Sequence, residues 1–586
     1  MSNKDKHQKQ QKDIDYKIER NVSLNHPRLI EIGKTIVSDK FPITMDNFWF
    51  ELNVNVIVNP FDFVTVENLH NTRTIGIVKE LQTIIIDSHY LLDDDYKEQR
   101  IPPSPTSTLD LDREKQQNVS SPKVLTIAKV AVMGNTGLGV DGTKNSISIN
   151  MPVGAGKIVK FASTEEIIFA LGIPEMGNPI PAGIIETTNG FQIPVTMDIS
   201  YLAGPDTAHV NASGISGNQK TTYLLFLLQS AYQKLKDENV ALIIFNTKQG
   251  ELLQIDKKQQ NVKERTTKLF NILNLEIQPF ENVTYFLPRG KDGKPNSSHI
   301  PNKYKTYSYE LLDIYDRLDL LLPDAYDPEY NLSSIIDYIY ESWPIKDSNS
   351  GREITTWSDL FEYDEYPQEI VSHKSSLLHF RSYLQRFRRS PMFTDKKVTS
   401  TYLGKEIKQI KSGDVFVIDV GLISSLDEQS FIVGDVMKSI DEMYSSRDYL
   451  IDDNNNERRH SDRPKYILIF VDEINRYIPK SYSLARMNAV SEQIMRTLIA
   501  GRSRGTILFS AQQFKSTTDY RLQENTGLHI TAKLGLSELS TDPYSMLDES
   551  TKMNIARLNK GELVMIHSAF RHPIKISFPQ AAFMRL

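Results

Sequence analysis

The sequence of 586 residues contains no cysteine. Disulfide bonds, thiolate zinc sites and cysteine nucleophiles are therefore excluded, and the absence fits a reducing cytoplasm, where we expect the protein to act. Positive charge is not in excess either, because the formal net charge is -6. The chain as a whole is therefore not a basic nucleic-acid-binding protein, although a local basic surface such as a pore is compatible with an acidic particle.

Long apolar runs are also missing. The N-terminal segment MSNKDKHQKQQKDIDYK is polar and charged, which predicts that it is not a signal peptide. No window approaches the ~18 uncharged apolar residues of a membrane-spanning helix, so we expect no membrane span. The sequence shows no His and carboxylate array with metal-ligand spacing and no convincing Ser-His-Asp arrangement.

What is present indicates several domains, since the chain is too long for one hydrophobic core. Residues 1–20 are rich in Lys, Gln and Asp and are predicted to be a disordered tail. Residues 21–200 contain segments such as FWFELNVNVIV and TIGIVKELQTIIID, which alternate apolar and polar side chains. A polar, proline-bearing loop is expected from Asp93 to about Pro122. Many short strands separated by turns predict a small β-barrel or sandwich.

The pattern changes after Ala208. HVNASGIS predicts a short strand that runs into a glycine-bearing loop, TTYLLFLLQSAYQKLK a helix, and VALIIFN a strand buried on both faces. Similar apolar strands are expected at 415–419, 466–472 and 506–512. Residues 201–256 and 411–586 are therefore predicted to form an α/β core, and residues 257–410 an inserted helical subdomain.

The loop between the first of these strands and its helix carries a phosphate-binding pattern. Such a loop needs glycines so that backbone N–H groups turn toward an anion, a lysine for the β- and γ-phosphates, and a hydroxyl for Mg²⁺. The predicted nucleotide-binding residues are Gly214, Ser216, Gly217, Asn218, Gln219, Lys220, Thr221 and Thr222. Gln219 departs from the pattern, because a glycine is usual there. The alternative is an ordinary strand-to-helix turn with an incidental lysine.

A second pattern is YILIFVDE, an apolar strand that ends in Asp472 and Glu473. Ligands of open α/β sheets bind at the carboxyl ends of strands. We therefore predict that Asp472 binds Mg²⁺ through water, together with Thr221, and that Glu473 polarises the attacking water. Two solvated acids at a strand end are the competing interpretation.

Other candidates cluster near later strands. Arg502 and Arg504 flank a serine just before the strand TILFSAQ, and one of them is a candidate for stabilising γ-phosphate charge across a subunit interface, the alternative being a solvated basic turn. Gln512 or Gln513 is a candidate γ-phosphate sensor, the alternative being a buried or merely exposed amide. Lys248 and Glu251, after VALIIFN, are candidates for a supporting role, the alternative being a plain polar loop. The basic run Lys374–Arg389 fits either a nucleic-acid contact or, more commonly, a solvated helix face.

These blocks together resemble one family. AGPDTAHVNASGISGNQKTTYLLFLL, IIFNTKQGELL, FVDEINRYIP, AGRSRGTILFSAQQ and LNKGELVMIHSAFRHPIKISFP are similar, in the same order, to blocks of the HerA family of hexameric DNA-translocating ATPases related to FtsK. Some bacterial members carry a similarly irregular phosphate loop. The N-terminal β domain is similar in place and size to the small barrel of that family. The resemblance covers residues 45–586 and is weak over residues 257–410.

The resemblance implies a RecA-like phosphate-loop core, a homohexameric ring, and ATP with Mg²⁺ hydrolysed at subunit interfaces. It also implies double-stranded DNA in a central pore, with Asp472 and Glu473 driving hydrolysis and Arg502 or Arg504 acting from a neighbouring subunit. Family members work with an effector that docks on the β domain, either a nuclease or, in phage-defence operons, a sirtuin-like NAD-cleaving protein.

Two other functions stay open from the residues. One is a nucleotide-binding ring that assembles and regulates an effector without moving along DNA, which Gln219 and the overall acidity favour and the acidic pair opposes. The other is a metabolic phosphate-loop kinase, which the arginine pattern and the large β domain oppose.

Overall fold

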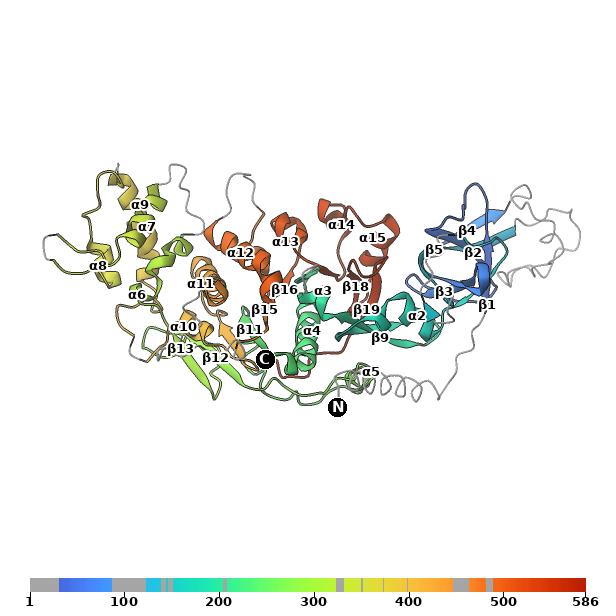
Figure 1. The fold of residues 1–586 in the computed structure, drawn as a ribbon, viewed down its shortest axis with the longest axis horizontal. Coiled ribbons are helices and arrows are strands. Elements are labelled where there is room, and N and C mark those ends of the chain that lie inside the picture. Colours follow the sequence, from blue (N-terminus) through green and yellow to red (C-terminus); the bar gives the residue numbers. More distant parts are fainter. Residues whose placement is uncertain are drawn as a thin grey trace, which may run out of the picture. The chain divides into compact units, whose positions relative to one another are not determined.

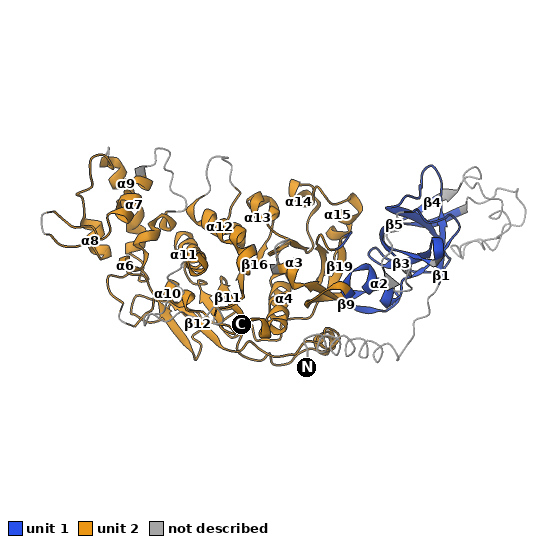
Figure 2. Cartoon of the chain, viewed as in Figure 1, with its two compact units in different colours: residues 1–174, 185–193, 570–572 blue, residues 175–184, 194–569, 573–586 orange. Residues whose placement is uncertain are grey.

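The computed structural model describes residues 31–86, 123–138, 144–145, 151–203, 208–322, 331–348, 351–371, 374–397, 399–445, 463–480 and 488–585 (Figure 1). The predicted tail at 1–20 and the predicted loop from Asp93 to Pro122 lie outside these ranges. The chain divides into two compact units (Figure 2). Unit 1 comprises residues 1–174, 185–193 and 570–572, and unit 2 comprises residues 175–184, 194–569 and 573–586.

Unit 1 contains the predicted small β-barrel, which the structure confirms. Its strands follow the order β2-β1-β7-β3-β4-β5, and a further pairing between β2 and β5 closes the ring. All of these pairs are antiparallel. Alternate apolar side chains, among them Phe48, Phe50, Val64 and Val130, fill the interior. The strands are β1 (Glu31–Ile36), β2 (Asn47–Leu52), β3 (Phe63–Glu67), β4 (Arg73–Ile86), β5 (Lys123–Leu138) and β7 (Ile158–Phe161), with β6 (Lys144–Asn145) added to β5 and helix α2 (Thr164–Ala170) following β7.

Unit 2 is built on a large mixed sheet, as the predicted α/β core requires. The described strands follow the order β13-β12-β14-β11-β15-β16-β10-β17-β18-β19-β8-β9. Pairing is parallel from β13 to β17 and antiparallel from β17 through β19 to β8. The strands are β8 (Pro179–Glu186), β9 (Gln192–Asp198), β10 (Val210–Ser213), β11 (Val240–Asn246), β12 (Val283–Pro288), β13 (Tyr304–Tyr307), β14 (Val415–Asp419), β15 (Tyr466–Val471), β16 (Thr506–Gln512), β17 (Leu528–Thr531), β18 (Glu562–Ile566) and β19 (Ile574–Ser577).

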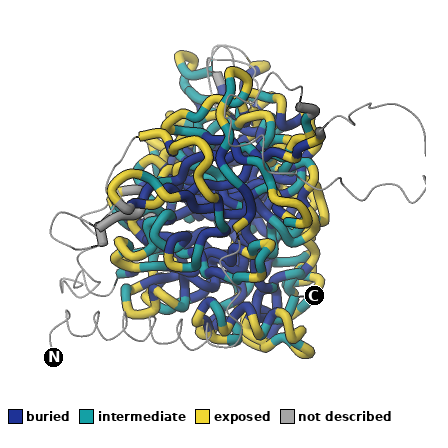
Figure 3. Tube along the Cα trace, turned by 90° about the vertical axis from the view of Figure 1, so that its right-hand side faces the viewer, coloured by how far each residue is buried: buried dark blue, intermediate teal, exposed yellow. Residues whose placement is uncertain are grey.

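The central strands are the apolar runs that the sequence predicts. Every residue of β11, β14 and β16 is buried, because helices cover both faces of a parallel sheet. Figure 3 shows that buried segments lie in the interior of the trace, with exposed segments around them. A strand buried on both faces therefore consists mainly of a continuous run of Val, Ile, Leu and Phe.

Two parts of the large sheet come from ranges that the sequence predicts to belong to other domains. Residues 257–410, for which the sequence predicts a helical insertion, also contribute β12 and β13. Residues 179–198, inside the range predicted for the N-terminal β domain, supply β8 and β9. Such short strands are identified by the partners they pair with, which local periodicity does not show.

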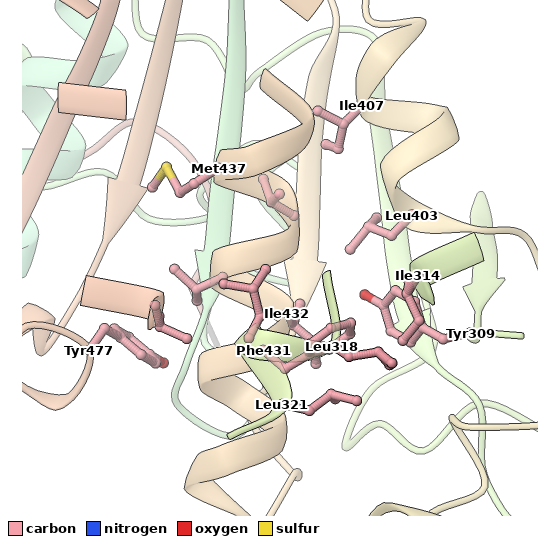
Figure 4. Close-up of a cluster of buried hydrophobic side chains, with 14 of the residues drawn as sticks. Tyr309, Ile314, Leu318, Leu321, Leu403, Ile407, Phe431, Ile432, Met437 and Tyr477 are labelled. Carbon is pink, nitrogen blue, oxygen red and sulfur yellow. The ribbon is translucent and has the colours of Figure 1, made fainter. Parts of the chain in front are cut away.

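The helices of unit 2 connect these strands, and those between residues 311 and 524 contribute to one extensive core. Phe431, Ile432 and Met437 of α11 belong to this core together with Leu318 and Leu321 of the 3₁₀ segment Tyr315–Leu321 (Figure 4). The described helices are α3 (Ile199–Ala203), α4 (Lys220–Lys234), α5 (Glu264–Ile272), α6 (Leu311–Ile314), α7 (Asn331–Glu341), α8 (Trp357–Glu362), α9 (Lys374–Arg388), α10 (Leu403–Lys408), α11 (Leu426–Ser445), α12 (Ala489–Arg504), α13 (Tyr520–Glu524), α14 (Leu536–Leu539) and α15 (Glu549–Ala556).

Within the described part of the chain, no helix combines the length and the apolar character that crossing a membrane requires.

Candidate functional site

The strand order of unit 2 brings four sequence-distant segments to one edge of the sheet. Strands β11, β15, β16 and β10 are consecutive neighbours and run parallel, so their carboxyl ends meet at the same edge. The loop 214–219 follows β10, and the acidic pair Asp472–Glu473 follows β15. Gln513 follows β16, and Lys248 follows β11. This edge is where open α/β sheets bind ligands.

Three residues of the loop 214–219 have left-handed or otherwise positive φ. Gly214 has a φ of 150°, and a Cβ there would lie 2.6 Å from the Cβ of Ala532. Gly217 has a φ of 82°, and Gln219 has a φ of 62° at the N-cap of α4. The position at which phosphate loops usually carry glycine is thus left-handed here too, although the residue is Gln219. The glutamine keeps the backbone path and carries the cost of a non-glycine residue in that region.

Lys220 is the first residue of α4 and folds back over the loop. Its Nζ donates to the carbonyl of Gly214 at 2.5 Å and to that of Ile215 at 3.4 Å. Burial lowers the pKa of the Lys220 ammonium, while the carboxylates of Glu473 and Asp472 act to raise it. A largely buried cation beside two acids, held by carbonyl groups alone, is suited to exchange those carbonyls for phosphate oxygens.

The next residue, Thr221, faces the acidic pair directly. Its Oγ1 donates to Oδ2 of Asp472 at 3.0 Å, although 251 positions separate the two residues. The side chain of Asp472 is only 4% exposed. Its other oxygen, Oδ1, accepts the backbone N–H of Glu473 at 2.9 Å, which fixes the orientation of the carboxylate. The two predicted Mg²⁺ ligands are therefore adjacent.

Lys248, expected only to support the site, contacts both acids. Its Nζ lies 2.6 Å from Oδ2 of Asp472 and 4.0 Å from Oε1 of Glu473. The lysine and Thr221 thus share one carboxylate oxygen. The loop that carries Lys248 is anchored, since Asn246 at the end of β11 donates to Asp419 at 2.8 Å and accepts from the backbone of Leu252 at 3.1 Å.

The two candidate sensor glutamines occupy different places. Gln513 donates from Nε2 to Oε1 of Glu473 at 3.4 Å. Gln512 is fully buried and belongs to a network under the sheet edge, donating to Asn211 at 3.3 Å and accepting from Thr518 at 2.8 Å. The structure therefore places Gln513 rather than Gln512 beside the acidic pair, because successive side chains of a strand point in opposite directions.

Helix α4 is held on several sides, which positions the loop before it. Tyr223 donates to the carbonyl of Ala182 at 3.0 Å, and Ser230 donates to that of Pro181 at 2.6 Å. Gln229 accepts the backbone N–H of Ala582 at 3.0 Å. A helix buried nearly all round is apolar on every face, as the run YLLFLL shows.

A pocket of about 320 Å³ opens over this edge. It brings together residues of the loop, of α4, of the segment after β11, Glu473 of the acidic pair, and residues of two later segments. Its lining residues are Ser216, Gly217, Gln219, Lys220, Thr221, Thr222, Lys248, Glu473, Lys560 and Arg585. Asn218 turns inward on the loop instead, with Nδ2 donating to the carbonyl of Ile215 at 3.5 Å.

Two lining residues were not singled out from the sequence. Arg585 donates from Nη1 to Oγ1 of Thr222 at 2.8 Å and pairs through Nη2 with Glu251. Lys560 lies just before Gly561, which has a φ of 93°. The signal for Lys560 is its place in the LNKGELVM block, whereas nothing in the local sequence around Arg585 indicates a site.

The predicted arginine pair lies elsewhere in the same chain. Arg504 ends α12 and forms an ion pair with Asp441 of α11. It precedes β16, whereas the pocket lies at the carboxyl end of that strand, so the pair is at the opposite edge of the sheet. The side chain of Arg502 lies outside the described part of the structure. A contact between Arg504 and this pocket therefore requires a second copy of the chain.

The basic run on α9 is engaged within its own unit. Arg381 donates to the carbonyl of Tyr363 at 2.6 Å, and Arg386 pairs with Asp427 at 3.1 Å. The guanidinium of Arg388 stacks over the ring of Phe361 with its carbon 5.0 Å from the ring centroid. These contacts favour the helix-face interpretation of the run over nucleic-acid binding.

The donor set at the edge fits Mg²⁺. Thr221 and Asp472 present oxygen atoms, the ligand type that Mg²⁺ prefers, and the ion commonly completes its shell with water and substrate phosphates. Among the described residues no group of three or more His, Asp or Glu converges as a protein-only metal cage. A site shared between protein and nucleotide is the arrangement that these residues suit.

Comparison with known proteins identifies no family for this chain. No family model and no curated protein matches it. Among solved structures, it is similar to the bacterial conjugative coupling protein TrwB, an unbound form, with a TM-score of 0.40, 13% identity, and coverage of 69% of this chain and 91% of that one. A TrwB complex with ADP and Mg²⁺ has a TM-score of 0.39 and 12% identity, with coverage of 67% of this chain and 90% of that one. The genome packaging NTPase B204 of Sulfolobus turreted icosahedral virus 2 with ATP-gammaS has a TM-score of 0.21 and 11% identity, with coverage of 30% of this chain and 74% of that one.

Proposed function

We propose that this chain is an ATP-hydrolysing DNA translocase of the HerA/FtsK type with a RecA-like core. The observation that carries the proposal is the 3.0 Å contact between Thr221 and Asp472, with Lys220 and Glu473 in the same pocket. A glycine-bearing loop, a lysine, a hydroxyl and two acids at one sheet edge are the set of groups that phosphoryl transfer to water requires.

Each residue has a distinct role in this proposal. The loop amides and Lys220 bind the β- and γ-phosphates, and Thr221 with Asp472 holds Mg²⁺. The bound ion neutralises charge on the phosphates. Glu473 accepts a proton from the attacking water, and Gln513 orients Glu473 through its 3.4 Å hydrogen bond.

The assembly belongs to the same proposal. We propose a homohexameric ring in which Arg502 or Arg504 of one subunit reaches the pocket of the next, with double-stranded DNA in the pore. A separate effector, either a nuclease or a sirtuin-like NAD-cleaving protein, docks on the β-barrel of unit 1, and the complex acts in antiviral defence in the cytoplasm. The position of Arg504 at the sheet edge opposite the pocket supports action between subunits rather than within one.

The test is DNA-stimulated ATP hydrolysis by the purified protein. Wild type is expected to hydrolyse ATP faster when duplex DNA is added, and Glu473→Gln is expected to abolish hydrolysis while keeping ATP binding. Lys220→Ala is expected to lose both. Equal hydrolysis with and without DNA, together with no movement along DNA, would refute translocation.

A nucleotide-binding scaffold is the second candidate, and the Lys248 contacts favour it. A lysine that pairs with Asp472 and Glu473 holds the catalytic acids in a charge-neutralised arrangement, which suits a ring that binds nucleotide and turns over slowly. The variant Lys220→Ala distinguishes the scaffold from the motor. A variant that assembles with its effector and still functions supports the scaffold, whereas one that assembles without function supports the motor.

A further inference from the structure

The residues around the pocket fall into two hydrogen-bonded groups. In the first, Thr221, Lys248 and Glu473 are linked through Asp472. In the second, Arg585 joins Thr222 to Glu251. The first group contains the Mg²⁺ ligands and the acid for the attacking water, so it marks the γ-phosphate end of a bound nucleotide. The second group lies one residue further along α4 and contains none of the Mg²⁺ ligands.

Arg585 is held in place by its backbone neighbours. Met584 donates its N–H to the carbonyl of Lys257 at 2.9 Å, and Phe583 forms a bridge with Lys258. Phe583 is almost fully buried. This segment therefore runs beside residues 257–259 and presents Arg585 to the first turn of α4. Because Thr222 and Glu251 also hold its guanidinium, Arg585 loses little side-chain entropy when it binds a ligand.

The chemistry of this position suits a phosphate. The Arg585 side chain is 26% exposed and lines the pocket, so it is accessible from the side where a nucleotide would enter. Burial lowers the pKa of its guanidinium, yet an arginine keeps its charge at every physiological pH. Thr222 and Glu251 engage Nη1 and Nη2, and each of these nitrogens carries a second N–H. Planar N–H pairs of this kind match phosphate oxygens.

We propose that Arg585 is a nucleotide-binding residue that contacts the α-phosphate end of the nucleotide from the same subunit that supplies the phosphate loop. The proposal rests on the proposed function, because it assumes that the loop 214–219 binds a nucleotide. It adds a cation that acts on ATP and ADP alike, in contrast to groups that recognise the γ-phosphate alone.

The experiment measures dissociation constants of the full-length protein for ADP and, in a Glu473→Gln background, for ATP. Arg585→Gln is expected to raise both constants by the same factor, about tenfold or more, since a hydrogen bond to a charged group contributes about 1.5–3 kcal/mol. Arg585→Lys is expected to recover part of the loss. In the Glu473 wild-type background, Arg585→Gln is expected to raise KM by a similar factor and leave kcat within about twofold.

Each alternative outcome has a separate meaning. Arg557→Gln, an exposed arginine that follows α15, is the matched control and is expected to leave both constants unchanged. Unchanged constants in Arg585→Gln, or a loss for ATP alone, would overturn the proposal. A lowered melting temperature without any recovery by Arg585→Lys would also overturn it, since the role would then be structural. If Lys220→Ala binds ATP like wild type, the proposed function itself fails, whatever Arg585 does.

Discussion

At the residue scale, the acidic pair is notable for the lysine that contacts it. Asp472 is buried, and its Oδ2 accepts hydrogen bonds from both Thr221 and Lys248. A carboxylate oxygen that binds a lysine is less available to a metal ion, because the two cations compete for the same atom. Lys248 is 48% exposed, so solvent screens this pair and it stabilises the arrangement only modestly.

Removing Lys248 should therefore make Mg²⁺ binding easier. Lys248→Ala is expected to lower the Mg²⁺ concentration for half-maximal ATP hydrolysis by about fivefold, which corresponds to about 1 kcal/mol. A titration of hydrolysis rate against Mg²⁺ checks this. Lys560→Ala removes another lysine of the same pocket and serves as the comparison. A higher Mg²⁺ requirement in Lys248→Ala would show that the lysine assists the ion instead.

A second residue-scale feature is Lys515, three residues beyond the end of β16. It is 2% exposed, its Nζ lies 3.0 Å from Nδ1 of His529, and its ammonium lies over the ring of Tyr544. Burial lowers the pKa of Lys515 from its ordinary value of 10.5 to about 7, with the Glu538 carboxylate opposing the shift. Between these two values the unfolded chain binds the proton more tightly than the folded chain does. Stability should therefore rise as pH increases from 7 toward 10.

The corresponding measurement is thermal unfolding of wild type and Lys515→Met at pH 7 and pH 9. The variant is expected to melt at higher temperature at pH 7, and the gap is expected to narrow by pH 9 as wild type gains roughly 2 kcal/mol. Lys480→Met, which removes an exposed lysine of the same unit, is the control. An equal gap at both pH values would contradict the linkage.

At the scale of elements, the strand β10, the loop 214–219 and helix α4 form one unit whose backbone is tightly restricted. Gly214 packs against Ala532 beyond the end of β17, and Gln219 holds the left-handed position before α4. The loop therefore contains one position where a side chain cannot fit and another where a side chain is present at a conformational cost.

Opposite substitutions at these two positions should have opposite effects. Gly214→Ala is expected to lower stability by about 1–3 kcal/mol and to weaken ATP binding, because its Cβ would collide with Ala532. Gln219→Gly is expected to stabilise the protein by up to about 1 kcal/mol and keep ATP binding, because it removes the left-handed strain. Melting temperature and ATP affinity check both. A destabilising Gln219→Gly would show that the glutamine side chain has a role of its own.

At the scale of the whole molecule, the position of the arginine pair is informative. Arg504 ends α12 on the edge of the sheet opposite the pocket and is paired with Asp441. A role of Arg504 in hydrolysis therefore depends on assembly, as in a ring whose sites lie between subunits.

Mixing experiments test that dependence. A variant that carries both Arg502→Ala and Arg504→Ala, and the variant Glu473→Gln, are each expected to reduce hydrolysis by at least about a thousandfold. Mixed rings are expected to regain activity, because an intact arginine and an intact Glu473 then meet at some interfaces. Native mass measurement of the particle is expected to show a hexamer. Monomers with wild-type hydrolysis, or mixtures without recovery, would exclude an arginine acting between subunits.

The sequence by itself determined the local elements of the core. The apolar runs at 415–419, 466–472 and 506–512 predict β14, β15 and β16 nearly residue by residue, because strands buried on both faces tolerate few polar residues. It also placed Lys220 and Thr221 at the start of a helix and Asp472 and Glu473 just after a strand. At such ends regular backbone pairing stops, so N–H groups and side chains can bind a ligand. Their role as a nucleotide site stays a prediction.

Only the tertiary structure decided which of these ends meet. Arg585 lies beside Thr222, and Lys248 beside Asp472, because strands and segments far apart in the chain become neighbours in the sheet. The same holds for β8 and β9, which lie in the range predicted for the N-terminal β domain, and for β12 and β13, which lie in the range predicted to be helical. Hydrogen bonding between strands is non-local, so the packing of the whole unit decides which strands pair, and for β12 and β13 it also decides that the segment is a strand.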